Sequence, residues 1–156
     1  MSNSEIKNQD YIFNIELMKK FLNVLKNLKS NEISSLKDED FSLIYCSLYN
    51  QIINILCSYV CKGPYNYLNI EDNPLISKDP LCSKLISEIN HYNLSNIRNN
   101  LTAHPLLIVN SSLNLPDDSL IDGWVDRLES IIKNNIPQLS KENIFQYAFN
   151  NNLISQ

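Results

Sequence analysis

The stretch from Asp38 to Lys62 constrains the fold most, because its apolar residues recur at helical spacing on two sides. Three acidic residues, Asp38 to Asp40, stand at its start, where a helix dipole favours negative charge. Gly63 and Pro64 follow and end the helix. A helix that is apolar on two sides is expected at the centre of a bundle. One apolar stripe holds Phe41, Ile44, Leu48, Ile52, Ile55 and Leu56, and the other holds Cys46, Ile53, Cys57, Val60 and Cys61.

The rest of the chain predicts further amphipathic helices and no sheet. Apolar residues recur at three and four over 11–29, from Pro80 to about 92, over 94–104, from Asp117 to about 134, and over 140–149. The segment 65–79 is predicted to be a long loop, and residues 80–104 could form one helix or two. We therefore expect an all-α bundle of about four to six helices in a single domain spanning 1–156, with 1–10 flexible.

Composition excludes several classes of function. The net charge is −4, whereas a protein that coats duplex DNA is usually basic. Only two glycines are present, so a glycine-rich phosphate loop is excluded. A small RNA-binding cleft with a few local cations remains compatible with the negative net charge.

The start of the chain and its four cysteines indicate a cytoplasmic protein. Residues 1–10 lack the basic start and apolar run of a signal peptide, and no uninterrupted apolar run is long enough to span a membrane. The cysteines form no C-x-x-C pair and are expected to stay reduced. Cys57 and Cys61 share a helix face, but two ligands do not make a metal site. We expect no metal, no cofactor and no membrane partner.

The segment Asn96–Pro105 carries the residues best suited to chemistry. It holds Arg98, one of two arginines in the chain, and His104, one of two histidines. Arginine stays cationic at any working pH, and histidine exchanges protons near neutrality. Polar Asn99 follows the arginine directly, and Pro105 disfavours helical geometry at His104.

This arrangement resembles the signature of the HEPN superfamily, an arginine and a polar residue followed by a histidine after a gap of four to six. Arg98-Asn99-Asn100-Leu101-Thr102-Ala103-His104 is closest to the abortive-infection-like members. The resemblance covers the motif and the helical layout. It implies a homodimeric, metal-independent endoribonuclease in phage defence or a toxin–antitoxin pair, with a possible antitoxin or regulatory partner.

The resemblance assigns candidate roles to individual residues. His104 would be the general acid or base, Arg98 would hold the phosphate, and Asn99 would orient the arginine or contact phosphate. Asn100, and Tyr65 and Tyr67 on the loop, are candidate RNA contacts, because tyrosine can stack on a base. Residues six apart on a helix point about 120° away from each other. Arg98 and His104 therefore converge only if the helix end unwinds or a second subunit completes the site.

One feature departs from the family pattern, and one alternative function stays open. Some toxin-type members carry a modifiable tyrosine two residues after the histidine, where this chain has Leu106. The alternative is a non-catalytic HEPN-like module that binds nucleotide or protein. In that case Arg98 and His104 would stabilise the dimer or bind the nucleotide. His91 is expected to be structural or solvated, and Trp124 is expected to belong to the core.

Overall fold

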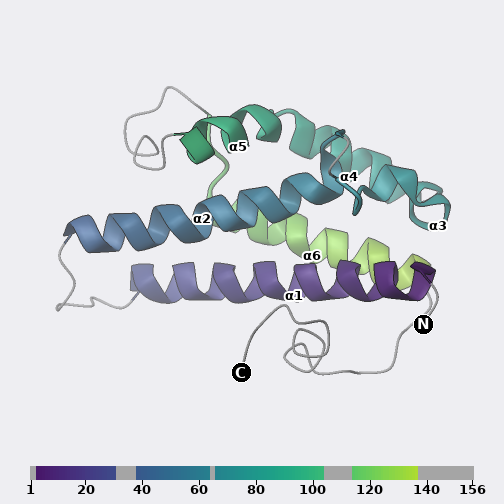
Figure 1. Ribbon diagram of the computed structural model, residues 1–156, viewed down its shortest axis with the longest axis horizontal. Coiled ribbons are helices and arrows are strands. Elements are labelled where there is room, and N and C mark those ends of the chain that lie inside the picture. The colour runs from purple at the N-terminus through teal and green to yellow at the C-terminus, as the bar shows by residue number, and fades with distance from the viewer. Residues whose placement is uncertain (1–2, 31–37, 64–65, 104–113, 137–156) are drawn as a thin grey trace.

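The structure is a computed structural model that describes residues 3–30, 38–63, 66–103 and 114–136. Within these ranges it contains six α-helices, one 3-10 helix and no strand, which confirms the predicted all-α bundle. The long helices α1, α2 and α6 lie lengthwise beside one another, with α4 and α5 along the far side of α2 from α1 (Figure 1). The elements are α1 (Asn3–Ser30), α2 (Asp38–Val60), η1 (Ile70–Asp72), α3 (Pro74–Ser77), α4 (Pro80–Asn90), α5 (Leu94–Ala103) and α6 (Asp118–Asn135).

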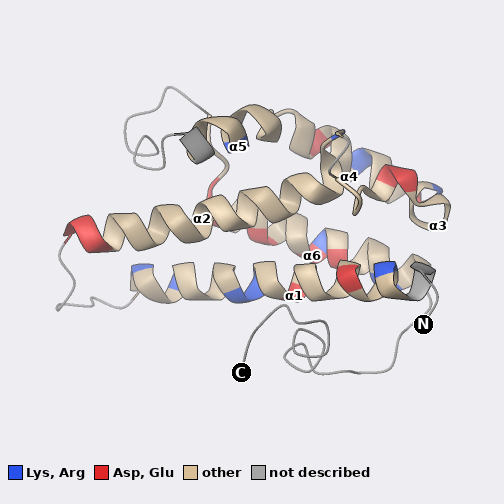
Figure 2. Cartoon of the chain, in the orientation of Figure 1, with Lys and Arg blue, Asp and Glu red and all other residues tan. Residues whose placement is uncertain are grey.

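Helices α1 and α6 pack antiparallel, and a row of ion pairs fixes their register. Lys19 Nζ lies 2.5 Å from Glu129 Oε2, and Lys26 Nζ lies 2.7 Å from Asp122 Oδ2. A third pair, Lys29–Asp118, follows towards the start of α6, so rising numbers on α1 meet falling numbers on α6. Figure 2 shows basic residues along α1 and acidic residues along α6, together with a few of the opposite charge on each helix. Exposed pairs contribute only about 0.2–1 kcal/mol each, so their main effect is on register.

Helix α2 is the apolar centre, as the two stripes predicted. It contacts α1 on one side and α5 on the other, and Figure 2 shows it uncharged beyond its acidic first turn. Its second half is buried, with Ile52, Ile53 and Leu56 all at 0% exposure, while Leu43 in its first half is 54% exposed. By length and composition α2 could cross a membrane, a test that core helices of soluble proteins also pass.

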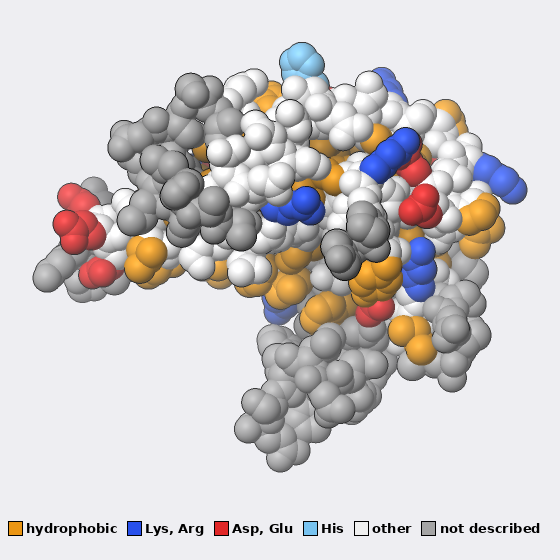
Figure 3. Space-filling view, turned by 45° about the horizontal axis from the view of Figure 1, so that its top comes forward, with side chains coloured by type: hydrophobic (Ala, Val, Ile, Leu, Met, Phe, Trp, Pro, Cys, Tyr) orange, Lys and Arg blue, Asp and Glu red, His pale blue; other side chains and the backbone are white. Residues whose placement is uncertain are grey.

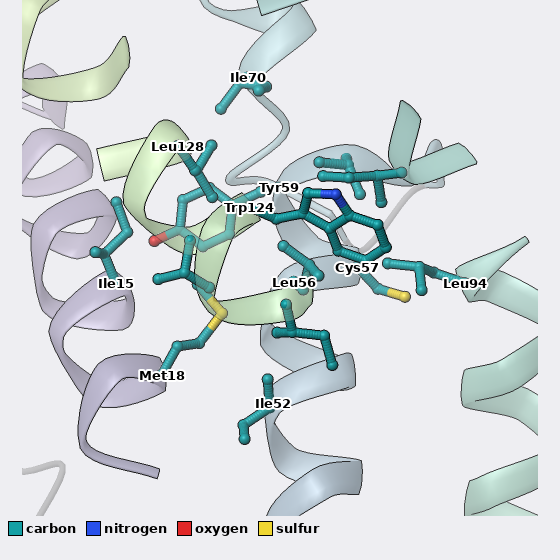
Figure 4. Close-up of a cluster of buried hydrophobic side chains, with 14 of the residues drawn as sticks. Ile15, Met18, Ile52, Leu56, Cys57, Tyr59, Ile70, Leu94, Trp124 and Leu128 are labelled. Atoms are coloured by element: carbon teal, nitrogen blue, oxygen red, sulfur yellow. The ribbon is translucent and has the colours of Figure 1, made fainter. Parts of the chain in front are cut away.

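Trp124 lies at the middle of the core, as expected for a structural residue. Its indole is fully buried, and Figure 4 shows it between the Leu56–Cys57 turn of α2 and Leu128 of its own helix. The ring of Tyr92 meets it edge-on, with centroids 5.3 Å apart. The indole nitrogen donates to Glu88 Oε1 at 2.9 Å, so the one polar atom of this side chain is satisfied.

Two segments differ from the prediction. Helix α1 begins at Asn3, eight residues before the predicted start, so 3–10 belong to this helix. The predicted loop 65–79 contains η1 and α3. Asn69 and Asn73 each accept a backbone N–H that opens one of these short helices. Such side-chain capping compensates for the weak apolar periodicity of this segment. The predicted helix over 140–149 lies outside the described residues.

Candidate functional site

Helix α5 carries the arginine of the motif, and it is separate from α4. Helix α4 ends at Asn90, and α5 begins at Leu94. Between them, Asn93 adopts a positive φ of 50°, in the left-handed region that asparagine tolerates better than most residues. The backbone oxygen of Asn93 accepts the N–H groups of Asn96 and Ile97. Residues 80–103 are therefore two helices joined by a left-handed turn.

One face of α5 is anchored in the core. Leu94, Ile97 and Leu101 are 2%, 1% and 2% exposed, as their spacing predicted. Four residues after Leu94, Arg98 is only about 40° further round an ideal helix. This places Arg98 at the border of the buried face, and it is half-buried. The docked helix therefore fixes the backbone position of Arg98 relative to the core.

The two asparagines after Arg98 lie on the open side of α5. Asn99 and Asn100 are both exposed. The amide of Asn100 donates to the backbone oxygen of Asn96 at 2.8 Å and lies 3.1 Å from its side-chain oxygen. Asn100 is therefore held against its own helix, whereas Asn99 faces outward beside the arginine.

The remaining predicted site residues are not brought together with Arg98 by the described structure. Tyr67 is 58% exposed, and its hydroxyl donates to Asp10 Oδ2 on α1 at 2.9 Å. Tyr67 is thus tied to α1 and not to α5. His104 and Tyr65 lie outside the described residues. The convergence of Arg98 and His104 remains a prediction.

The immediate surroundings of Arg98 include a group that the motif did not indicate. Helix α5 packs against α2. The neighbouring Cys61 thiol and burial raise the pKa of Cys57, and the neighbouring Cys57 thiol lowers the pKa of Cys61, while the positive charge of Arg98 acts to lower both.

The other arginine has a structural role. Arg127 on α6 donates to both carboxylate oxygens of Glu88 on α4, at 2.6 and 2.9 Å. These bonds, together with the one from the Trp124 indole, hold the pKa of Glu88 at about 2. Arg127 therefore joins α4 to α6 as a bidentate pair. His91, the other histidine, is an exposed residue at the end of α4.

Figure 3 shows one face of the molecule, with several acidic side chains gathered at its left end. Elsewhere on this face, basic and acidic side chains are scattered between uncharged atoms and hydrophobic patches. Within the described ranges, no group of three or more His, Cys, Asp or Glu side chains could hold a metal ion. Comparison of the chain with protein-family models, curated proteins and solved structures gives no match.

Proposed function

We propose that the chain is a metal-independent endoribonuclease of HEPN type. In this chemistry the RNA 2′-hydroxyl attacks the adjacent phosphorus, the P–O5′ bond breaks, and the 5′-oxygen leaves with a proton. His104 acts as general acid or base, and Arg98 holds the phosphate and offsets charge that develops in the transition state. A planar guanidinium suits a phosphate because it can donate two parallel hydrogen bonds.

The observation that carries this proposal is the anchoring of α5. Ile97 and Leu101, on either side of Arg98 in the sequence, are buried. The backbone position of the arginine is therefore fixed relative to the core. Asn99 is exposed next to it and can contact the same phosphate. Catalysis by placement needs a rigid support for the side chains, and a helix docked in the core provides one.

A single arginine–histidine pair is a sparse site, so we propose that two copies assemble. A two-fold dimer places the same patch of each subunit across the axis. The Asn96–Pro105 segments would then face each other and supply two arginines and two histidines. Asn100, Tyr65 and Tyr67 are the proposed RNA contacts, and the biological role is in phage defence or a toxin–antitoxin pair in the cytoplasm.

The alternative, a non-catalytic module that binds nucleotide or protein, has one observation in its favour. Arg98 is half-buried and close to the thiols of α2, where a guanidinium can stabilise the junction of α2 and α5. In this role the arginine would be structural. The two functions make opposite predictions for a folded variant at position 104.

The test exploits the two arginines and two histidines in the chain. Cleavage of a mixed RNA pool is measured for His104→Ala with His91→Ala as its matched control, and for Arg98→Lys with Arg127→Lys as its control. We expect a loss of about 10²–10⁴-fold for His104→Ala, because placed proton transfer contributes that much. Arg98→Lys should also lose most activity, because lysine lacks the planar fork.

Circular dichroism provides the folding control for all four variants. Both control variants should keep cleavage within about twofold of the parent, since neither residue is in the motif. A folded His104→Ala protein that cleaves as fast as the parent contradicts the nuclease proposal and favours the alternative.

A further inference from the structure

Apolar residues of α1 and α2 form a face along the outside of this helix pair. On α1 they recur at steps of four, three and four, and on α2 at steps of four and seven, so each set lies on one side of its helix. Val24 is 43% exposed and Ile44 is 37% exposed, while the other members are half-buried. The members, called the α1–α2 face below, are Leu17, Phe21, Val24 and Leu28 on α1, and Ile44, Leu48 and Ile55 on α2.

Two contacts between the helices bring the two halves of this face level with each other. The hydroxyl of Tyr59 on α2 donates to the backbone oxygen of Tyr11 on α1 at 2.5 Å. Further along the pair, Lys29 Nζ of α1 lies 5.2 Å from the ring centre of Tyr45 on α2. Rising numbers on α1 therefore meet falling numbers on α2. In this register the residues at about equal height are Leu28 with Ile44, Val24 with Leu48, and Leu17 with Ile55.

The α1–α2 face points away from α6. Two of the lysines that pair α1 with α6 each follow a member of the face, Leu17 or Val24, by two residues. Residues two apart on an ideal helix point about 160° away from each other. On α2, Ile55 precedes Cys57 by two residues, and Figure 4 shows Cys57 beside Trp124 of α6.

The other described helices also lie elsewhere. Helices α4 and α5 are on the far side of α2 from α1 (Figure 1). Within the described ranges, α4, α5 and α6 thus occupy other sides of the α1–α2 pair. An exposed apolar face of this extent is rare on a stable domain and marks a surface that another element covers.

The chain contains a segment that matches this face in character and length. Residues 140–149, outside the described residues, carry apolar side chains at helical spacing, and no charged residue follows Glu142. A helix of ten residues is about 15 Å long, and the rise from Leu17 to Leu28 along α1 is about 16 Å. An uncharged amphipathic helix of this length can cover the face from one end to the other.

The end of α6 lies where this segment has to start. Because α6 runs antiparallel to α1 with Glu129 beside Lys19, Asn135 lies beside the N-terminal half of α1, just before the level of Leu17. The chain from Asn135 to Ser140 can span about 17 Å. Half the circumference of a helix about 11 Å across is also about 17 Å. The link is therefore long enough to pass round α1 from the α6 side to the α1–α2 face.

We propose that residues 140–149 of the same chain form a helix that packs on the α1–α2 face, parallel to α1. This helix covers Val24 and Ile44 and gives the α1–α2 pair a packed helix on the side opposite α6. It leaves α5 uncovered, because α5 is on the far side of α2 from α1 (Figure 1). The packing does not depend on the proposed function.

Hydrogen exchange of the full-length protein, followed by mass spectrometry of its peptides, tests whether residues 140–149 pack. We expect them to exchange at least about tenfold more slowly than the same sequence as a free peptide, because packed helices open rarely. Val24→Asp and Ile44→Asp each place a charge under the helix and should remove this protection. Leu81→Asp is the matched control, because Leu81 is a 58% exposed apolar residue on α4, and it should keep the protection.

Cysteine cross-linking identifies what covers the face. The four natural cysteines are at most 6% exposed, so an introduced surface pair is oxidised first. Val24→Cys with Ala148→Cys should form a disulfide within one chain, because parallel packing puts these positions at about the same height. Leu81→Cys with Ala148→Cys is the control and should give at most about a tenth as much, because a disulfide needs Cβ atoms about 3.5–4.5 Å apart.

Three results would overturn the proposal. They are free-peptide exchange of 140–149 in the parent, equal loss of protection in Leu81→Asp, and a Val24–Ala148 cross-link that joins two chains, which would make a second copy the occupant. Circular dichroism reports whether each variant is folded. If both aspartate variants of the face fail to fold, Phe145→Asp changes only the C-terminal segment. It should then remove the protection of 140–149 and raise the iodoacetamide labelling rate of the Val24→Cys protein, and an unchanged rate would contradict the packing.

Discussion

Replacing Ile97 with alanine tests the docking of α5, on which the position of Arg98 depends. Ile97 is 1% exposed and faces the core from the middle turn of α5. The substitution removes three carbon groups and leaves the helix backbone and Arg98 unchanged. Alanine is also a better helix former than isoleucine, so any loss of stability comes from packing and not from propensity.

The magnitude follows from complete burial. Three buried carbon groups at about 0.8 kcal/mol each give about 2.4 kcal/mol of lost transfer free energy. A cavity left behind adds to this loss, and measured Ile→Ala substitutions in cores cost about 2–5 kcal/mol. We therefore expect the free energy of unfolding to fall by about 2–4 kcal/mol. With a urea m-value of about 2 kcal/mol/M, the midpoint falls by about 1–2 M.

The assay is urea unfolding followed by two signals. Trp124 is the chain's one tryptophan and is fully buried on α6, so its fluorescence reports the central core. Circular dichroism at 222 nm reports all helices, including α5. The matched control is Asn99→Ala, which changes an exposed residue two positions away and should shift the midpoint by no more than about 0.3 M.

Two outcomes would refute the reasoning. An Ile97→Ala midpoint equal to that of Asn99→Ala would mean that α5 adds nothing to the cooperative core. A helix signal that is lost well before the Trp124 signal, at a urea concentration that Ile97→Ala lowers and Asn99→Ala does not, would mean that α5 unfolds separately and that the position of Arg98 is not fixed by the core.

Three further outcomes are expected. Light scattering at micromolar concentration should give a dimer, and a monomer would contradict the proposed composite site. RNA cleavage should persist in excess chelator, and a loss reversed by a divalent ion would overturn the metal-independent mechanism. Burial alone would raise the pKa of Asp118, but the hydrogen bond from Lys29 holds it below the usual value. The lowered pKa of Asp118 stabilises the folded state; this stabilisation is complete above about pH 3.9 and is lost as the pH falls through the lowered pKa. Asp118→Asn should therefore flatten the acid side of a curve of unfolding free energy against pH.

Strong periodicity and helix-end signals predicted most of the helices. The apolar stripes predicted α2 from Asp38 with an end within two residues, and the helix predicted from Asp117 is α6, which begins at Asp118 with Asp117 as its cap. The start of α1 was predicted wrongly because 3–10 carry little apolar pattern. The helix there is supported by contacts from elsewhere, such as the Tyr67 hydroxyl on Asp10. Contacts of this kind leave no periodic trace in the sequence.

The spacing of charged residues on two helices also carries a signal for their packing. Lysines at 19, 26 and 29 are seven and three residues apart, and acidic residues at 118, 122 and 129 are four and seven residues apart. Matching steps of opposite charge indicate two helices that pack along one face, and these residues form the α1–α6 ion pairs.

The surroundings of Arg98 could not have been predicted in the same way. Ser95 is one turn away, and the helix period places it near the arginine. Cys61 follows directly after α2, and the register of α2 against α5 depends on how Leu94 and Ile97 fit between side chains of α2. No spacing rule encodes that fit. The motif therefore indicated which arginine to consider, while the packing determined what lies next to it.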